Sequence, residues 1–142
     1  MRISTKGSYG LRAIIDLSLN SKGEYVSLIS IAERQNISKN YLEQVFSSLR
    51  KSGIVKSVKG SQGGYLLNGD PSEITAGDIL RALEGDLSVA KSELKANKID
   101  ACIRRSLWDK IDEKVFELVD SITLEDLIND YRRDSDFSMY YI

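Results

Sequence analysis

The chain has 142 residues, 42% of them hydrophobic, which allows one core of ordinary size but not two large independent domains. It has no histidine and one cysteine, so histidine-containing zinc sites, Ser-His and Cys-His nucleophiles and an internal disulfide are excluded. The net charge of −1 is unevenly distributed, because residues 1–67 carry ten Lys/Arg and four Asp/Glu, whereas residues 68–142 carry ten and seventeen. The basic first half is expected to attract phosphate, and the acidic second half to limit indiscriminate coating of DNA.

The sequence shows neither the pattern of a signal peptide nor an apolar run of the roughly 20 residues that cross a bilayer. A single cysteine is compatible with a reducing compartment. We therefore expect a soluble, cytoplasmic protein that has no membrane partner.

Three helices are predicted in residues 1–53. The first covers residues 8–19, where apolar side chains recur at helical spacing and a polar stretch follows. A short extended piece leads to Ser27, the predicted N-cap of a second helix that ends near residue 35. Ser38 is the predicted cap of the third helix, which ends at Gly53. Its apolar residues lie at positions i, i+3, i+4 and i+7: Leu42, Val45, Phe46 and Leu49.

The second and third helices are joined by the short turn Asn36 to Ser38, as in a helix-turn-helix. The outward face of the third helix carries amides, a carboxylate and cations: Lys39, Asn40, Glu43, Gln44, Ser47, Arg50 and Lys51. Asn and Gln can bind adenine, Glu can accept a hydrogen bond from cytosine, and the basic side chains can hold phosphates. Any surface helix can show such residues, so this face alone leaves DNA binding and simple solvation open.

Two short apolar runs flank the glycine-rich segment VKGSQGGYLL, residues 58–67, and predict a β-hairpin wing. We expect Gly60, Gly63 and Gly64 to permit positive φ angles and a close approach of the backbone to a sugar-phosphate wall. Lys59 is placed to enter a minor groove. The alternative is a nucleotide-binding loop, but such a loop leads into a helix and, in the Walker form, carries Gly-Lys-Ser/Thr.

Three segments, in this order and spacing, resemble a known family. They are MRISTKGSYGLRAI, ISKNYLEQVFSSLRKSGIVKSVKGSQGGYLL and ITAGDILRALEG, and they are similar to the CymR and IscR group of bacterial winged-helix regulators, the Rrf2 family. The resemblance implies a mainly α-helical fold with a small β-hairpin, in which a winged helix-turn-helix domain precedes a long dimerisation helix. It implies a dimeric transcription regulator that binds double-stranded DNA and is not an enzyme.

The resemblance also carries DNA-binding positions onto the third helix, the wing tip and an N-terminal segment near the DNA backbone. With the two basic residues that end the third helix, the predicted DNA-binding residues are Ser4, Thr5, Lys6, Tyr9, Ser38, Lys39, Asn40, Tyr41, Glu43, Gln44, Arg50, Lys51, Lys59 and Gly60. Many relatives have arginine where this chain has Lys59. Lysine keeps the charge but lacks the flat guanidinium that suits a narrow minor groove, so weaker sequence preference is expected there.

We divide the chain into four parts: a winged helix-turn-helix domain (1–67), a linking helix and loop (68–101), dimerisation helices (102–131) and a C-terminal tail (132–142). In the linking part, a capping box at Thr75 predicts a helix that ends at Gly85. Its expected inward residues are Ile79, Leu80 and Leu83.

An apolar stripe in steps of three or four residues runs through the charged segment that follows: Ile103, Leu107, Ile111, Val115, Leu118 and Ile122. Packing within the same chain could cover this stripe. The family resemblance and the two-fold symmetry of DNA half-sites favour a homodimer instead.

Relatives of the IscR type bind an iron–sulfur cluster through three cysteines and a histidine before the dimerisation helix. The matching stretch here, SVAKSELKANKIDACIRRSLW, has Cys102 as its one cysteine and Arg105 at the histidine position. One thiolate per subunit cannot supply four ligands, so we expect no cluster, no other metal site and no cofactor. Cys102 is a candidate redox thiol because Arg104 and Arg105 favour a thiolate; the alternative is an unreactive small residue at a helix start.

A capping box at Thr123 predicts a last helix that ends near Tyr131, followed by a mobile polar stretch and the letters FSMYYI. The resemblance implies that CymR-type regulators work with cysteine synthase, which accepts a C-terminal isoleucine in its active-site cleft. A free carboxylate held by backbone amides is a known recognition mode. The residues expected to dock into cysteine synthase are Met139, Tyr140, Tyr141 and Ile142. Alternatively, the aromatic residues of this tail fold back onto the dimer.

The function expected from these features is repression of cysteine or sulfur metabolism genes, with cysteine synthase as the signalling partner. Two alternatives remain open. One is a regulator of the same fold that senses iron–sulfur or thiol redox status, and the other is a winged-helix module that binds protein and no DNA.

Overall fold

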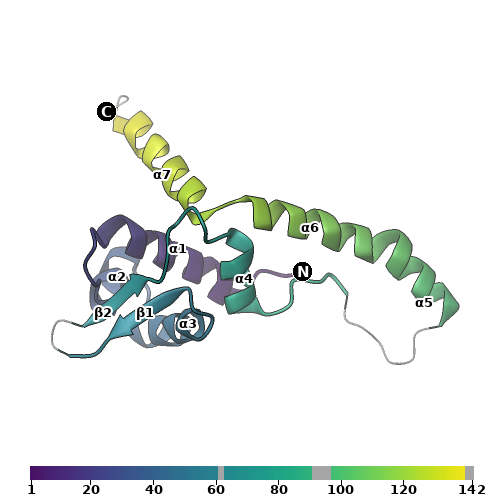
Figure 1. The fold of residues 1–142 in the computed structure, drawn as a ribbon, viewed down its shortest axis with the longest axis horizontal. Helices are drawn as coiled ribbons and strands as arrows, with labels where there is room; N and C mark the ends of the chain where they lie inside the picture. The colour runs from purple at the N-terminus through teal and green to yellow at the C-terminus, as the bar shows by residue number, and fades with distance from the viewer. Residues whose placement is uncertain (61–62, 91–96, 140–142) are drawn as a thin grey trace.

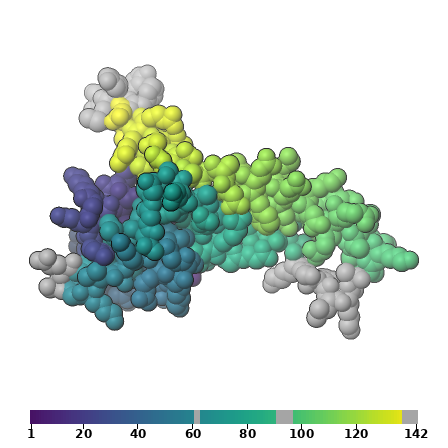
Figure 2. Space-filling view, in the orientation of Figure 1, coloured from purple at the N-terminus to yellow at the C-terminus, as the bar shows by residue number. Residues whose placement is uncertain are grey.

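The computed structural model describes residues 1–60, 63–90 and 97–139, with the backbone alone for residues 137–139. A winged-helix body contains the first half of the chain, and a long helical rod extends from it to one side (Figure 1). A last helix projects from the body in another direction, so the molecule has two arms on one compact base (Figure 2).

The elements follow one another in the predicted order. The body comprises α1 (Thr5–Asn20), α2 (Leu28–Gln35), α3 (Lys39–Lys51), β1 (Val55–Val58), β2 (Gly64–Leu67) and α4 (Ala76–Glu84). The arms comprise α5 (Lys98–Ile103), a π-helical turn (Arg104–Trp108), α6 (Asp109–Ser121) and α7 (Leu124–Met139). The expected mainly α-helical class with a small hairpin is confirmed.

Local capping explains where the helix-turn-helix begins and turns. The Ser27 hydroxyl accepts a hydrogen bond from the Ser30 backbone N–H at 3.2 Å, and the Ser38 hydroxyl accepts one from the Tyr41 N–H at 3.1 Å. Between the two helices, Asn36 adopts a left-handed conformation with φ of 54°, which asparagine tolerates better than most residues. The predicted capping by both serines is confirmed.

The wing is an antiparallel hairpin in which Val55 pairs with Leu67 and Val58 with Gly64. Val26, from the extended piece before α2, forms an isolated antiparallel bridge with Tyr65. Its N–H donates to the Tyr65 carbonyl at 2.9 Å, and its carbonyl accepts from the Tyr65 N–H at 2.8 Å. The wing is therefore attached to the helix-turn-helix by backbone hydrogen bonds.

The wing glycines differ from our expectation. Gly60 has a positive φ of 121°, whereas Gly63 and Gly64 do not lie in that region, so the expected positive φ at these two positions is wrong. A Cβ at Gly63 would overlap the carbonyl oxygen of Val58, and one at Gly64 that of Val26. These two glycines are required because the chain's own backbone passes too close for a side chain.

One core joins the body to the base of α7. Its fully buried side chains come from α1, α2, α3, α4, β1 and α7: Ala13, Ile14, Leu17, Ile31, Leu42, Val45, Phe46, Leu49, Val55, Ile79 and Leu124. A second, smaller cluster of Leu80, Leu87 and Val119 connects α4 to α6. The C-terminal half of α6 is thus anchored on α4, and the start of α7 is anchored on the core of the body.

The junction between the arms is held by main-chain pairing with the residues at the start of α4. The Ala76 N–H donates to the Ile122 carbonyl at 2.7 Å, and the Leu124 N–H donates to the Ile74 carbonyl at 2.8 Å. Both predicted capping boxes form, with reciprocal hydrogen bonds of 3.0 Å between Thr75 and Asp78 and of 3.0 Å between Thr123 and Asp126. The last helix is longer than expected: α7 continues to Met139, so its predicted end near Tyr131 is wrong. Residues 132–139 contain no glycine or proline to stop the helix.

Among the helices that the structure describes, none combines the length and apolar character that a membrane span requires.

Candidate nucleic-acid interface

The outward face of α3 presents the predicted groove residues to solvent. Ser38, Lys39, Asn40, Glu43 and Gln44 are exposed, whereas Tyr41 is partly buried. The Lys39 ammonium lies 3.5 Å from the Glu43 carboxylate, one helical turn apart. The amide groups of Asn40 and Gln44 therefore stand beside a paired cation and anion on the same helix, a surface that can read base edges.

The N-terminal segment lies against α3. The Lys6 ammonium donates to the Ser48 hydroxyl at 2.8 Å, and the Tyr9 ring meets the Tyr41 ring edge-on at a centroid distance of 6.0 Å. These contacts bring two segments that are about forty residues apart in the sequence onto one surface. Tyr9 is also covered by the Arg12 guanidinium, whose carbon lies 5.0 Å from the ring centroid.

Ser4 and Thr5 are exposed at the start of α1, and their position depends on a residue that sequence reasoning missed. The Glu84 carboxylate, at the end of α4, accepts hydrogen bonds from the backbone and hydroxyl of Ser4. The two residues are 80 positions apart, and no local pattern links them. Such a contact becomes visible only when α4 is packed on α1.

The remaining predicted basic residues lie at the margins of this surface. Arg50 and Lys51 are exposed at the C-terminal end of α3, where cations also stabilise the helix dipole. Lys59 and Gly60 are exposed immediately after β1, at the start of the wing connection. All four residues are exposed, as phosphate-binding groups have to be.

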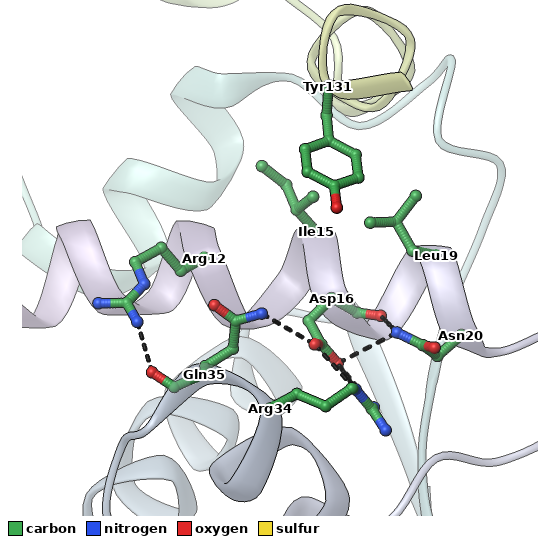
Figure 3. Close-up of a pocket in the computed structure, with 8 residues that line it drawn as sticks. All are labelled: Arg12, Ile15, Asp16, Leu19, Asn20, Arg34, Gln35 and Tyr131. Atoms are coloured by element: carbon green, nitrogen blue, oxygen red, sulfur yellow. Dashed lines mark hydrogen bonds and ion pairs between the residues drawn. The ribbon is translucent and has the colours of Figure 1, made fainter. Parts of the chain in front are cut away.

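A buried carboxylate fixes the angle between α1 and α2. Asp16, 4% exposed, accepts from the Arg34 Nη2 at 2.7 Å, from Arg34 Nε at 3.0 Å and from the Gln35 amide at 2.9 Å (Figure 3). The hydrogen bond to Asp16 raises the pKa of Arg34 above its usual value, so the guanidinium stays charged. The same view shows Tyr131, from α7, with its hydroxyl directed toward α1 between Ile15 and Leu19. The helix-turn-helix is thus tied to α1 by charge-assisted hydrogen bonds.

The predicted dimerisation stripe is divided between partly buried and exposed positions. Val115 packs against the second cluster, and Ile111 and Ile122 are partly buried. By contrast, Ile103 is 37%, Leu107 47% and Leu118 59% exposed. The stripe therefore has one part that packs within the chain and one part that remains open.

Two further predicted sites are the candidate redox thiol and the C-terminal docking tail. Cys102 is exposed on α5, and its sulfur lies 3.9 Å from the Ser106 hydroxyl oxygen. The proposed docking tail falls largely outside the described residues: the structure gives the backbone of Met139 as the end of α7, and residues 140–142 are not described.

Comparison with known proteins identifies the family. The model of the Rrf2 family, described as an iron-dependent transcriptional regulator, matches residues 3–130. The chain belongs to the Rrf2 family of transcriptional regulators. It is 44% identical to the HTH-type transcriptional regulator CymR of Bacillus subtilis over 142 residues, which is 100% of each chain. It is 40% identical to the HTH-type transcriptional regulator IscR of Klebsiella pneumoniae over 131 residues, 91% of this chain and 80% of the relative.

A solved structure agrees with this assignment. The structure of CymR, described as the global cysteine regulator of B. subtilis, is similar with a TM-score of 0.76 and 45% identity, over 91% of this chain and 97% of that one. These relatives are transcriptional regulators and not enzymes, as expected for this chain.

The family's description implies iron, but the donor atoms of this chain do not fit an iron–sulfur cluster. The whole sequence has one cysteine and no histidine. In the described ranges, no three Cys, Asp, Glu or His side chains come together as a metal site, and Cys102 stands on an exposed helix face. The ligand set that such clusters use is therefore missing from the chain.

Proposed function

We propose that this Rrf2-family regulator binds duplex DNA through α3, the N-terminal segment and the wing. The observation that carries the proposal is the contact between Lys6 and Ser48, because Ser48 lies one helical turn from Gln44 and its hydroxyl bonds to the Gln44 carbonyl, so an N-terminal cation meets the helix that bears the exposed amides. In this arrangement Gln44 and its neighbours read base edges, Lys6, Arg50, Lys51 and Lys59 hold phosphates, and Ser4 lies near the DNA backbone. The basic charge of residues 1–67, ten Lys/Arg against four Asp/Glu, supports this assignment.

The functional unit in this proposal is a homodimer in the cytoplasm. The exposed apolar side chains of Ile103, Leu107 and Leu118 on α5, the π-turn and α6 favour burial against a second copy. Two copies would present two α3 helices to the two half-sites of a symmetric operator. The four-part division of the chain stays a prediction, and in this structure α4 shares the core of the body.

The regulated genes in this proposal are those of cysteine or sulfur metabolism, with the chain acting as a repressor. Similarity to CymR over the full length of both chains supports this choice. Cysteine synthase is the proposed signalling partner, bound by Met139 to Ile142. That contact rests on the sequence FSMYYI and on the family resemblance alone.

The DNA-binding proposal is tested by selecting duplexes from a random pool with the purified protein and measuring affinity for the selected sequence from low to high salt. A steep fall of affinity with salt, and preference for a two-fold symmetric sequence, are expected. Lack of salt-dependent affinity for any duplex would contradict the proposal and favour a module that binds protein only.

The partner proposal is tested by titrating the intact protein, and a variant lacking Ile142, into cysteine synthase while its cofactor fluorescence is followed. Binding that disappears without Ile142 is the expected result. Equal binding by both forms, or no binding by either, would contradict docking of this tail.

Thiol sensing is the second candidate, and it is favoured by the exposure of Cys102. It predicts that oxidation changes the DNA affinity of the wild-type protein but not of Cys102→Ser. An iron–sulfur sensor would instead show iron in anaerobically purified protein, which the single cysteine argues against.

A further inference from the structure

A single carboxylate oxygen holds the beginning of α1. Glu84 Oε1 accepts hydrogen bonds from the Ser4 backbone N–H at 2.8 Å, the Ser4 hydroxyl at 2.7 Å and the Gly7 backbone N–H at 2.9 Å. Ser4 is the N-cap of α1, and Gly7 lies in its first turn. Glu84 thus does from α4 what a capping side chain ordinarily does from within its own helix.

The composition of α1 makes an outside cap useful. The Ser4 side chain caps no amide of α1, and the first turn contains no acidic residue. The first N–H groups of a helix have no partner within the helix, and negative charge is favoured at that end of its dipole. Glu84 supplies both the acceptor and the charge.

The contact with Glu84 leaves no room for a side chain at Gly7. A Cβ at this buried position would overlap Glu84 Oε1, so any side chain there would displace the carboxylate. The absence of a side chain at Gly7 and the carboxylate of Glu84 therefore belong to one arrangement.

We propose that Glu84 is a positioning residue for DNA binding, because it orients the segment Ser4 to Lys6 against α3 for phosphate contact. This inference rests on the proposed function, in which that segment contacts the DNA backbone. Lys6 lies between the two capped residues and reaches Ser48 at 2.8 Å. The cap therefore fixes the point from which the Lys6 cation projects.

Because Glu84 is an acidic residue, the direction in which its removal changes DNA affinity tests the proposal. A carboxylate near bound phosphates opposes DNA binding by Coulomb repulsion alone, so its removal would tighten binding. If Glu84 instead positions Ser4 and Lys6, its removal weakens binding. The two roles predict opposite changes.

The test measures the affinity of full-length variants for the selected duplex over a range of salt concentrations, beside their thermal unfolding. Glu84→Ala is expected to weaken binding about fivefold, the size of a lost helix cap. Glu84→Gln keeps an oxygen that can accept the same hydrogen bonds, so it is expected to lose less DNA affinity than Glu84→Ala. Asp86→Asn, which removes a neighbouring exposed charge and leaves the cap intact, is expected to bind as well as wild type or better.

Gly7→Ala provides a second route to the same loss. It displaces the carboxylate without changing any charge, and alanine is a better helix former than glycine, so the helix itself is retained. Weaker DNA binding is expected, together with faster hydrogen exchange of the Ser4 and Gly7 amides.

Either of two results would overturn the proposal: Glu84→Ala binding at least as tightly as Asp86→Asn, or Gly7→Ala keeping wild-type affinity while its amides exchange quickly. If wild type binds no duplex, the proposed function itself fails and the inference falls with it. If wild type binds DNA and the Glu84 and Gly7 variants bind it equally well, the positioning role fails but the proposed function stands.

Discussion

The winged-helix body and the rod of α5 and α6 use apolar side chains in opposite ways. On α3, the inward residues Leu42 and Phe46 are fully buried at 0% exposure by their own chain. On the rod, Leu107 and Leu118 remain 47% and 59% exposed. The body thus buries its apolar side chains within the chain, with help from the base of α7, whereas the rod presents exposed apolar surface, which is typical of an interaction site.

The two regions also differ in charge and in how they are attached. The first 67 residues carry an excess of cations and the remainder an excess of anions. Their junction uses a bidentate ion pair, in which Arg81 on α4 donates to both oxygens of Asp120 on α6 at 2.7 and 3.0 Å. Gly77 lies beneath this pair, where a Cβ would overlap the Asp120 carboxylate. In the proposed function, phosphate contact belongs to the basic region and partner contact to the rod.

The largest expected effect is on the stability of the body. Phe46 is fully buried and its ring centroid lies 4.9 Å from that of Tyr65 in the wing. Phe46→Ala should lower the free energy of unfolding by about 3–5 kcal/mol, because it removes buried area and leaves a cavity. Urea denaturation measures this loss, with Lys51→Ala as a surface control. A loss below about 1 kcal/mol would mean that the body does not depend on this core.

The next effect concerns the rod. Leu107→Asp combined with Leu118→Asp should produce a monomer, since burial of each leucine contributes about 2 kcal/mol and a symmetric dimer loses each contribution twice. Light scattering measures the mass, and urea denaturation should show that the body remains folded. Lys114→Ala, at an 82% exposed position of α6, is the matched control. A double variant that stays dimeric would place the interface elsewhere.

Within the body, base reading and phosphate binding can be separated. Gln44→Ala should cost about 1–3 kcal/mol at one base position and relax specificity there, because Gln44 is assigned to a base edge. Lys51→Ala should weaken binding to all sequences alike and reduce the salt dependence. Affinities for the selected duplex and for single-base variants distinguish the two. Identical behaviour of both variants would contradict the assignment of groove and phosphate contacts.

The smallest effect is at the junction. The hydrogen bond from Arg81 holds the pKa of Asp120 below its ordinary value, so its stabilising contribution is present above the unfolded-state pKa and is lost as pH falls through the folded-state pKa. Both side chains are more than a third exposed, at 37% and 45%, so screening keeps the contribution below about 1 kcal/mol.

Asp120→Asn should therefore lower stability at neutral pH and have little effect in strong acid. Urea denaturation of wild type and variant at pH 7 and near pH 3 measures this difference. An equal loss at both pH values would mean that Asp120 acts through packing and not through its charge.

Most of the helices were predictable because their signals are local. Ser27, Ser38, Thr75 and Thr123 precede apolar periodic segments, and each begins a helix as expected. The end of α7 was not predicted, because a polar sequence without glycine or proline can continue as helix or leave it. The roles of Gly63 and Gly64 were also missed, since the backbone that excludes a side chain there belongs in part to Val26, far away in the sequence.

The sequence by itself determined the order of the elements, the helix-turn-helix and the family, because caps, periodicity and turn residues act over a few neighbouring positions. Only the tertiary structure decided which surfaces face each other: Glu84 at the start of α1, Lys6 beside Ser48, and a stripe on α6 that is partly buried at Val115 and open at Leu118. These contacts join residues separated by long stretches of chain or distinguish neighbouring faces of one helix. They depend on how helices pack, and packing angles follow from the shape of the whole core.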